Sequence, residues 1–331
     1  MLEFSIIHAD DRRSRLERWL HEVLRGAPFA LTPASEDASF RRYFRATLDD
    51  GASFVIMDAP PEKEDCRPFV HVALLLHGAG VHAPEVHAAD LAAGFLLLSD
   101  LGTRTYLAEL NAGNADALMR DAIEALVRWQ LATRPHELPP YDEALLRREM
   151  NLFPEWYVGR HRGLTLNPAQ AQVLEGIFAT LVKSALAQSA VYVHRDYMPR
   201  NLMVSAPNPG VLDFQDAVIG PISYDMVSLV RDAFISWEEE RVLDWSVRYW
   251  EKAREARLPV PSEFAEFWRA FEWMGLQRHL KVLGIFARIN YRDGKPKYLE
   301  DTPRFLRYAR AVAERYRELA PLARLLDQVQ A

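Results

Sequence analysis

The sequence predicts an α+β protein with two lobes, a small β-rich lobe over residues 1–101 and a large, mostly helical lobe over residues 102–331. A chain of 331 residues is long enough to form two compact parts. Strand-like segments and a hairpin turn concentrate before residue 101, whereas almost every long segment after residue 103 has the apolar spacing of a helix. These observations favour two lobes of different secondary structure.

The small lobe is expected to begin with an amphipathic helix within residues 11–25. Five apolar residues of this segment recur on one helix face: Leu16, Trp19, Leu20, Val23 and Leu24. Strands are expected at residues 40–48 and 53–57, joined by an Asp-Gly turn that tolerates a positive φ. Residues 69–77 are apolar enough for a helix, and residues 94–98 for the strand that leads into the large lobe.

The large lobe contains seven segments with helical spacing: residues 115–131, 141–156, 168–188, 224–234, 239–256, 262–288 and 302–328. Three short apolar runs are expected to be buried strands: residues 190–193, 202–204 and 210–212. The polar residues between these strands therefore lie in loops beside a small sheet.

Composition and charge exclude several classes of protein. Hydrophobic residues make up 49% of the chain, which is incompatible with extensive disorder. A net charge of −6 disfavours nonspecific binding to nucleic acid, which requires surplus Lys and Arg. Cys66 is the only cysteine, and no apolar run is long enough to cross a membrane. We therefore expect a soluble, cytoplasmic protein, a monomer that acts on a small molecule and binds neither nucleic acid nor a membrane.

Residues 193–201, followed by Asp213, carry the strongest functional signal. They contain His194, Asp196 and Asn201 in the spacing H-x-D-x-x-x-x-N, and Asp213 follows twelve residues after Asn201. Phosphoryl transfer uses such a set: Asp196 is predicted to orient the attacking hydroxyl as its base, and Asn201 and Asp213 to hold Mg²⁺ against the phosphates of ATP.

Three segments, residues 194–204, 211–216 and 277–288, resemble the aminoglycoside phosphotransferase and choline kinase branch of the protein-kinase-like fold. Within it they are most similar to the anomeric sugar kinases, which act on N-acetylmuramate and N-acetylglucosamine in bacterial peptidoglycan recycling. The similarity extends from residue 38 to residue 295. It implies a nucleotide-binding small lobe and a catalytic, acceptor-binding large lobe.

The resemblance also implies roles for particular residues. The adenine is expected to bind backbone groups of Ser99, Asp100 and Leu101, and Asp225 to brace the catalytic loop from the start of a helix. Candidate acceptor-binding side chains are Tyr197, Arg200, Gln215, Asp216 and Glu149, with Arg278 and Arg288 as cations for a carboxylate. The alternative for the basic residues of segment 277–292 is a solvated helix face.

The sequence departs from the protein-kinase pattern in two places, because it has neither a Gly-rich loop nor a lysine on the third strand. Met57 occupies the expected lysine position. Ser39 in the loop and Arg41 and Arg45 on the following strand are therefore predicted to contact the nucleotide. Strand alternation places these two arginines on one face. They could instead pair with surface acids.

The sequence thus predicts an ATP- and Mg²⁺-dependent sugar kinase that phosphorylates the anomeric hydroxyl of N-acetylmuramate and N-acetylglucosamine to give the sugar 1-phosphate. One alternative is a kinase of another small alcohol, such as an aminoglycoside, choline or homoserine. Another is a catalytically inactive nucleotide-binding regulator, which the missing lysine suggests and the intact Asp196, Asn201 and Asp213 oppose.

Overall fold

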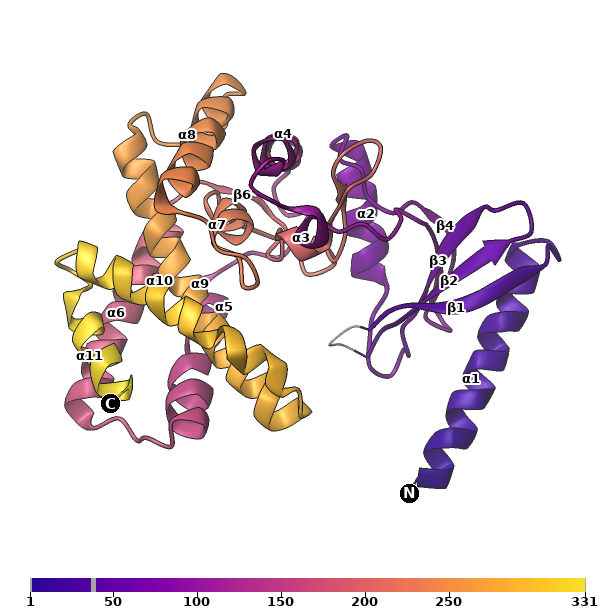
Figure 1. The fold of residues 1–331 in the computed structure, drawn as a ribbon, viewed down its shortest axis with the longest axis horizontal. Helices are drawn as coiled ribbons and strands as arrows, with labels where there is room; N and C mark the ends of the chain where they lie inside the picture. The colour runs from indigo at the N-terminus through magenta and orange to yellow at the C-terminus, as the bar shows by residue number, and fades with distance from the viewer. Residues whose placement is uncertain (1, 37–39, 331) are drawn as a thin grey trace.

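The structure, a computed structural model, describes residues 2–36 and 40–330 (Figure 1). Ser39, one of the predicted nucleotide contacts, lies outside the described residues. The N-terminal part contains a five-stranded antiparallel sheet in the order β1-β2-β3-β5-β4. Its strands are β1 (Phe29–Glu36), β2 (Arg42–Leu48), β3 (Ser53–Asp58), β4 (Val86–Asp90) and β5 (Phe95–Ser99).

The structure confirms the predicted hairpin and the strand before residue 100. β2 and β3 pair antiparallel, and Gly51 in their turn has φ 87°. β1 and β4 were not predicted. β1 contains Pro33 and few large apolar residues, and only the edge of a sheet tolerates such a strand. β4 has just five residues, so its alternation is too short to recognise.

Alternating side chains of the sheet enter two different cores. Helix α1 (Leu2–Val23) packs on one face, where Leu16 and Leu20 meet Ile56 and Phe95 (Figure 1). The opposite face contributes Met57 and its neighbours to the main core, together with helix α2 (Arg67–Gly78). This main core continues into the helices after residue 101, so the sheet is joined to the rest of the molecule through a single apolar interior.

The C-terminal part is mostly helical, as predicted. Its α-helices are α3 (Tyr106–Glu109), α4 (Ala115–Leu131), α5 (Glu143–Met150), α6 (Pro168–Leu186), α7 (Tyr224–Val230), α8 (Glu239–Glu255), α9 (Phe264–Asp293), α10 (Thr302–Arg315) and α11 (Ala320–Gln330). A π-helix, η1 (Phe153–His161), and two 3₁₀ turns, η2 (Pro199–Asn201) and η3 (Pro296–Asp301), complete it. Most of α9 is buried, and it packs against helices on several sides.

Two predicted helices are divided, in each case near a proline. Residues 141–156 form α5 and then η1, because Pro154 has no N–H to continue an α-helical ladder. Residues 302–328 form α10 and α11, and Pro321 lies in the first turn of the second helix. Of the residues that the structure describes, none form a helix long and apolar enough to span a membrane.

Candidate active site

Two small antiparallel ribbons bring the predicted catalytic loops together. β6 (Ala190–Val193) pairs with β9 (Val218–Pro221), and β7 (Leu202–Met203) pairs with β8 (Gly210–Val211). The loop between β6 and β7 therefore lies beside the loop between β8 and β9. The buried imidazole of His194 joins them by donating from Nε2 to the Leu212 carbonyl at 3.0 Å. Burial lowers the pKa of His194 to about 4, so the ring is neutral at physiological pH.

The structure brings Asp196, Asn201 and Asp213 to one point. The Asn201 amide nitrogen donates to the Asp196 carbonyl at 3.0 Å and to Asp213 Oδ2 at 3.2 Å. Gln215 donates to the other Asp213 oxygen at 2.9 Å. Arg195, which precedes the predicted base, has φ 75°, and the predicted metal ligand Asp213 has φ 61°, so both hold an uncommon left-handed backbone.

Asp225 braces the catalytic loop, as the resemblance implied. Its fully buried carboxyl group accepts the backbone N–H groups of His194 at 2.6 Å and Arg195 at 3.0 Å. Burial raises the pKa of Asp225 to about 7, although these two hydrogen bonds act in the opposite direction. The Asp225 carboxylate, in the first turn of α7, therefore holds the backbone immediately before Asp196 through two hydrogen bonds.

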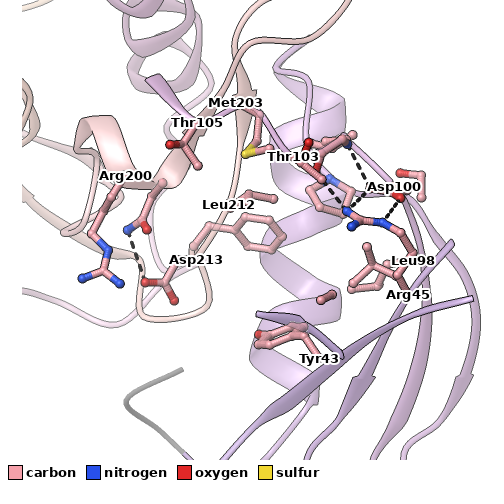
Figure 2. A pocket seen from close by; sticks show the side chains of 18 of the residues that line it. Tyr43, Arg45, Leu98, Asp100, Thr103, Thr105, Arg200, Met203, Leu212 and Asp213 are labelled. Atoms are coloured by element: carbon pink, nitrogen blue, oxygen red, sulfur yellow. Dashed lines mark hydrogen bonds and ion pairs between the residues drawn. The ribbon is translucent and has the colours of Figure 1, made fainter. Parts of the chain in front are cut away.

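A pocket of about 310 Å³ extends from these loops to the sheet. Figure 2 shows Arg200 and Asp213 at one end of it and Arg45, Leu98 and Asp100 at the other. The walls between the two ends are largely apolar: Tyr43, Val55, Phe69, Leu98, Leu101, Met203, Leu212 and Phe214. A flat apolar slot that leads to a polar end suits a nucleotide, whose base and phosphates differ in the same way.

The hinge after β5 forms the end of the pocket remote from Asp213. Predicted residues Ser99, Asp100 and Leu101 all line it. The Asp100 carboxylate accepts hydrogen bonds from Arg45 Nε at 2.5 Å and from Arg45 Nη2 at 3.0 Å. Burial by itself would raise the pKa of Asp100, but hydrogen bonds from Arg45, the Gly102 N–H and the Ser53 hydroxyl outweigh it and lower the pKa. Arg45 thus lines the pocket at its hinge end.

Arg41 and Met57 are the remaining residues that were discussed for the nucleotide site. Arg41 precedes β2, and its Nε atom lies 3.7 Å from Glu64 Oε2. Arg41 therefore pairs with an acid, which was the alternative to a contact with the nucleotide. Met57 lies on the third strand, β3, and is buried, with the Tyr43 hydroxyl 3.5 Å from its sulfur. Among the described residues that line the pocket, Arg45 and Arg200 supply the positive charge.

Asn201 and Asp213 match a magnesium site in the chemistry of their donor atoms. The Asn201 side chain forms two hydrogen bonds, and both are donated by its Nδ2 atom. Within residues 40–330 its side-chain oxygen, Oδ1, accepts no hydrogen bond. No group of three or more His, Cys, Asp or Glu side chains in the described parts of the chain could hold a metal ion. Magnesium does not need such a group, because phosphate oxygens and water usually complete its coordination.

Two predicted acceptor contacts are contradicted by burial. Tyr197 is 1% exposed, and its hydroxyl donates to the Ala122 carbonyl at 2.7 Å, so the ring belongs to the core. Arg278 is 3% exposed and donates to the Arg231 carbonyl at 3.3 Å. Its charge opposes the rise in pKa that burial causes at Asp225 and Asp232. Arg278 therefore stabilises buried acids and does not present its charge to an acceptor.

The prediction that Glu149 contacts the acceptor is also contradicted by burial, because Glu149 is a buried, paired charge. Its carboxylate binds Arg195 at 2.5 Å, Lys281 at 2.9 Å and the hydroxyl of Tyr141. Lys281 also donates to the Tyr224 hydroxyl at 3.0 Å. These side chains form a buried cluster, and Arg195 and Lys281 in it interact electrostatically with Asp196. Lys281 therefore does not belong to the solvated basic face that was considered for the segment 277–292.

The remaining acceptor candidates lie at different places. Gln215 holds Asp213, while its own amide oxygen is buried without a partner among the described residues. Asp216 is exposed, and its carbonyl accepts from Arg195 at 3.3 Å. Arg200 is exposed at the pocket end beside Asn201. Arg288 lies ten residues beyond Arg278 on α9, about 15 Å along the helix, so the two predicted cations do not form one site.

Arg195, Lys281 and Phe234 are the residues of this region whose roles sequence reasoning missed. Arg195 occupies a variable position of the motif, and nothing local links it to Glu149 or Lys281. Phe234, under the guanidinium of Arg200, ends the segment 224–234 that was predicted to be helical, but in the structure α7 stops at Val230 and Phe234 lies in the loop that follows. No local signal marks the charges of α9 as buried, because its sequence mixes apolar and charged residues, and only the packing in the structure shows that most of the helix is buried.

Comparisons with known proteins identify a family and several relatives of this chain. The model of the phosphotransferase enzyme family matches residues 30–264. The chain is 55% identical to the N-acetylmuramate/N-acetylglucosamine kinase of Pseudomonas putida, over 97% of this chain and 98% of that protein. It is 58% identical to the protein of the same name from Pseudomonas aeruginosa, over 90% and 88% of the two chains. A third, from Neisseria meningitidis, is 54% identical over 96% of each.

Solved structures share the fold at low identity. The aminoglycoside phosphotransferase APH(2'')-Ib, bound to ADP, superimposes with a TM-score of 0.60 at 15% identity, covering 89% of this chain and 97% of that one. A choline/ethanolamine kinase family protein from Mesorhizobium loti gives a TM-score of 0.61 at 16% identity, with coverage of 97% and 99%. Their likeness shows the two-lobe architecture.

Proposed function

Because this chain belongs to the phosphotransferase enzyme family, we propose that it transfers the γ-phosphoryl group of ATP to N-acetylmuramate and N-acetylglucosamine. The observation that carries the chemistry is that Asn201 and Asp213 line one end of the nucleotide-sized pocket, and that the Asn201 amide group joins Asp213 to the backbone carbonyl of Asp196. The substrates are those of relatives that are 54–58% identical over nearly all of their length. Membership of the family also agrees with the predicted resemblance.

The proposed acceptor atom is the anomeric hydroxyl, so the product is the sugar 1-phosphate. Asp196 accepts the proton of that hydroxyl as the sugar oxygen bonds to the γ-phosphorus. The bond from this phosphorus to the bridging oxygen then breaks, and ADP leaves. Asn201 and Asp213 would hold Mg²⁺, which when bound neutralises charge on the phosphates. The adenine would lie against the hinge, at Ser99, Asp100 and Leu101.

The proposal extends to the setting of the reaction. A cytoplasmic location is supported by the need for ATP and by the single cysteine, Cys66, which is buried as a free thiol. In that setting the enzyme would return cell-wall sugars released inside the cell to metabolism. It would act as a monomer without nucleic acid.

The test is a turnover panel with the purified protein, Mg²⁺ and ATP. Phosphorylation of both amino sugars, with the product phosphorus on C1 by ³¹P NMR, is the expected result. A matched control is the methyl glycoside of N-acetylglucosamine, whose blocked anomeric oxygen should prevent turnover. Transfer only to an aminoglycoside, choline or homoserine would replace the proposed substrates, and nucleotide binding without any turnover would identify a regulator.

A further inference from the structure

The missing third-strand lysine leaves the phosphate end of the pocket in need of a cation. Met57, at the position predicted for the lysine, is a buried, uncharged side chain. Asp213 adds negative charge at the end where the phosphates of ATP would lie, and the backbone of Asp196 is linked to it through Asn201. A bound Mg²⁺ offsets only part of the charge of a triphosphate held beside the Asp213 carboxylate. A further positive group must therefore come from residues that line this end.

Arg45 does not meet this need. Its guanidinium is paired with the Asp100 carboxylate and also donates to the Gly102 carbonyl at 3.1 Å. These partners belong to the hinge, at the opposite end of the pocket from Asp213 (Figure 2). The positive charge of Arg45 is therefore neutralised by Asp100 and is remote from the phosphate end.

Arg200 is placed where the charge is needed. It immediately precedes Asn201 and lines the pocket at the Asp213 end (Figure 2). Its guanidinium carbon lies 5.2 Å from the centre of the Phe234 ring, and within the described parts of the chain it forms no hydrogen bond or ion pair. Stacking restrains the plane of a guanidinium but uses none of its five N–H donors.

The ring under Arg200 is itself held firmly. Phe234 belongs to the loop between α7 and α8, and Asp232 accepts the Phe234 N–H at 2.9 Å and the Ile235 N–H at 3.2 Å. The Phe234 side chain packs against Tyr298 in an edge-on arrangement, with ring centres 6.5 Å apart. Arg200 is thus presented by a supported aromatic surface.

From this placement we propose that Arg200 binds the γ-phosphoryl group during transfer, in the role that a third-strand lysine has in protein kinases. The inference rests on the proposed kinase function. The fork of guanidinium donors matches two oxygens of a phosphoryl group. A contact to the group in transit stabilises the transition state more than bound substrates, so the effect of Arg200 falls mainly on kcat.

The experiment compares Arg200→Gln and Arg200→Lys with the unaltered protein by calorimetry and by turnover. For Arg200→Gln we expect Mg²⁺·ATP to bind about tenfold more weakly, while the affinity for ADP, which lacks the γ-phosphate, changes less than about twofold. We expect kcat to fall by about a hundredfold or more, equally with N-acetylmuramate and N-acetylglucosamine. Arg200→Lys should recover part of the lost kcat, since it keeps the charge.

Arg254→Gln is the matched control, because Arg254 is an exposed arginine on α8 stacked over Trp250 at 4.7 Å, and its loss should leave every value unchanged. Equal losses of ATP and ADP affinity would overturn the proposal. So would a loss confined to N-acetylmuramate, which would make Arg200 the cation for the acceptor carboxylate. If the unaltered protein phosphorylated neither sugar, the proposed substrates would fail, and the ATP and ADP affinities would still decide the role of Arg200.

Discussion

At the scale of single residues, the proposed transfer relies on Asp196 as its base. Asp196→Asn keeps the size of the side chain but cannot take a proton. We expect turnover to fall at least about a hundredfold while the affinity for Mg²⁺·ATP stays nearly unchanged. Steady-state kinetics and calorimetry measure the two quantities. Near-normal turnover in this variant would remove Asp196 from the role of base.

Glu149 provides a prediction about stability and pH. Burial opposes ionisation of this carboxyl group, but the charges of Lys281 and Arg195 and the Tyr141 hydroxyl lower its pKa to about 2. A pKa depressed below the unfolded value stabilises the fold above about pH 4.5, by roughly 3 kcal/mol, and this stabilisation is lost as the pH falls toward 2. Glu149→Gln should cost roughly 3–5 kcal/mol at pH 7, because two cations lose their partner.

Urea unfolding at pH 7, 5 and 4 measures this effect, and the difference between the two proteins should begin to narrow below about pH 4.5. Glu175→Gln is the control, since Glu175 pairs with Arg147 at 2.7 Å on the exposed surface. Its loss should cost less than about 1 kcal/mol. If both variants lowered the free energy of unfolding by a similar amount at pH 7, the buried cluster would contribute no more to stability than a surface ion pair.

Residue-scale features were predictable from the sequence where a local spacing carried them. Asp196, Asn201 and Asp213 belong to one motif, and the structure brings them together. Glu149 and Lys281 meet only because α5 and α9 pack side by side, so no local pattern could pair them. Arg278 was misassigned for the same reason, because its burial follows from the packing around α9 and not from its neighbours in sequence.

At the scale of elements, the close approach of α9 to the chain between α5 and η1 depends on Gly284. A Cβ atom at this position would overlap the backbone carbonyl of Leu152, which cannot move without displacing η1. Gly284→Ala should therefore lower the free energy of unfolding by roughly 2–3 kcal/mol, despite alanine's better helix propensity. Urea unfolding followed by circular dichroism measures the change.

Gly176→Ala is the matched control, because Gly176 lies inside helix α6 with open space around the new Cβ. This substitution should be neutral or stabilise by up to about 1 kcal/mol. The idea that Gly284 permits tight helix contact is wrong if both alanine variants behave alike.

Helices were predictable where periodicity and length agreed. α4 occupies residues 115–131, as predicted, because its apolar face is regular along the whole segment. The segments that contain Pro154 and Pro321 kept an apolar pattern across a break in the backbone, so periodicity alone joined elements that the prolines separate. The edge strands β1 and β4 were missed because β1 contains Pro33 and few large apolar residues and β4 has only five residues.

At the scale of the whole molecule, nucleotide binding should stabilise both lobes together, since residues of the sheet and of the catalytic loops line one pocket. Saturating Mg²⁺·ATP should raise the melting temperature, by an amount that corresponds to about 2.7 kcal/mol at a hundred times Kd. Asp213→Ala should abolish this rise, because the phosphates would lose their link to the metal. Asn201→Ala should have a smaller effect.

Thermal unfolding with and without Mg²⁺·ATP gives the comparison, and ATP with a chelator provides the control for metal dependence. An undiminished rise for Asp213→Ala would show that the metal ligands lie elsewhere. The two-lobe plan that underlies this test was predicted from the change in pattern near residue 101. The shared core across that point was not, because sequence patterns do not report which apolar faces meet.

The separate apolar cluster beneath α1 has a consequence for how the protein opens. Leu16 and Leu20 bury themselves only against the outer face of the sheet, whereas the pocket is lined from the other face. Detachment of α1 is therefore a sub-global opening that need not disturb the nucleotide site. Backbone amides of α1 would then exchange with solvent deuterium at a rate insensitive to bound nucleotide, while those of the central helix α9 would be released only by global unfolding.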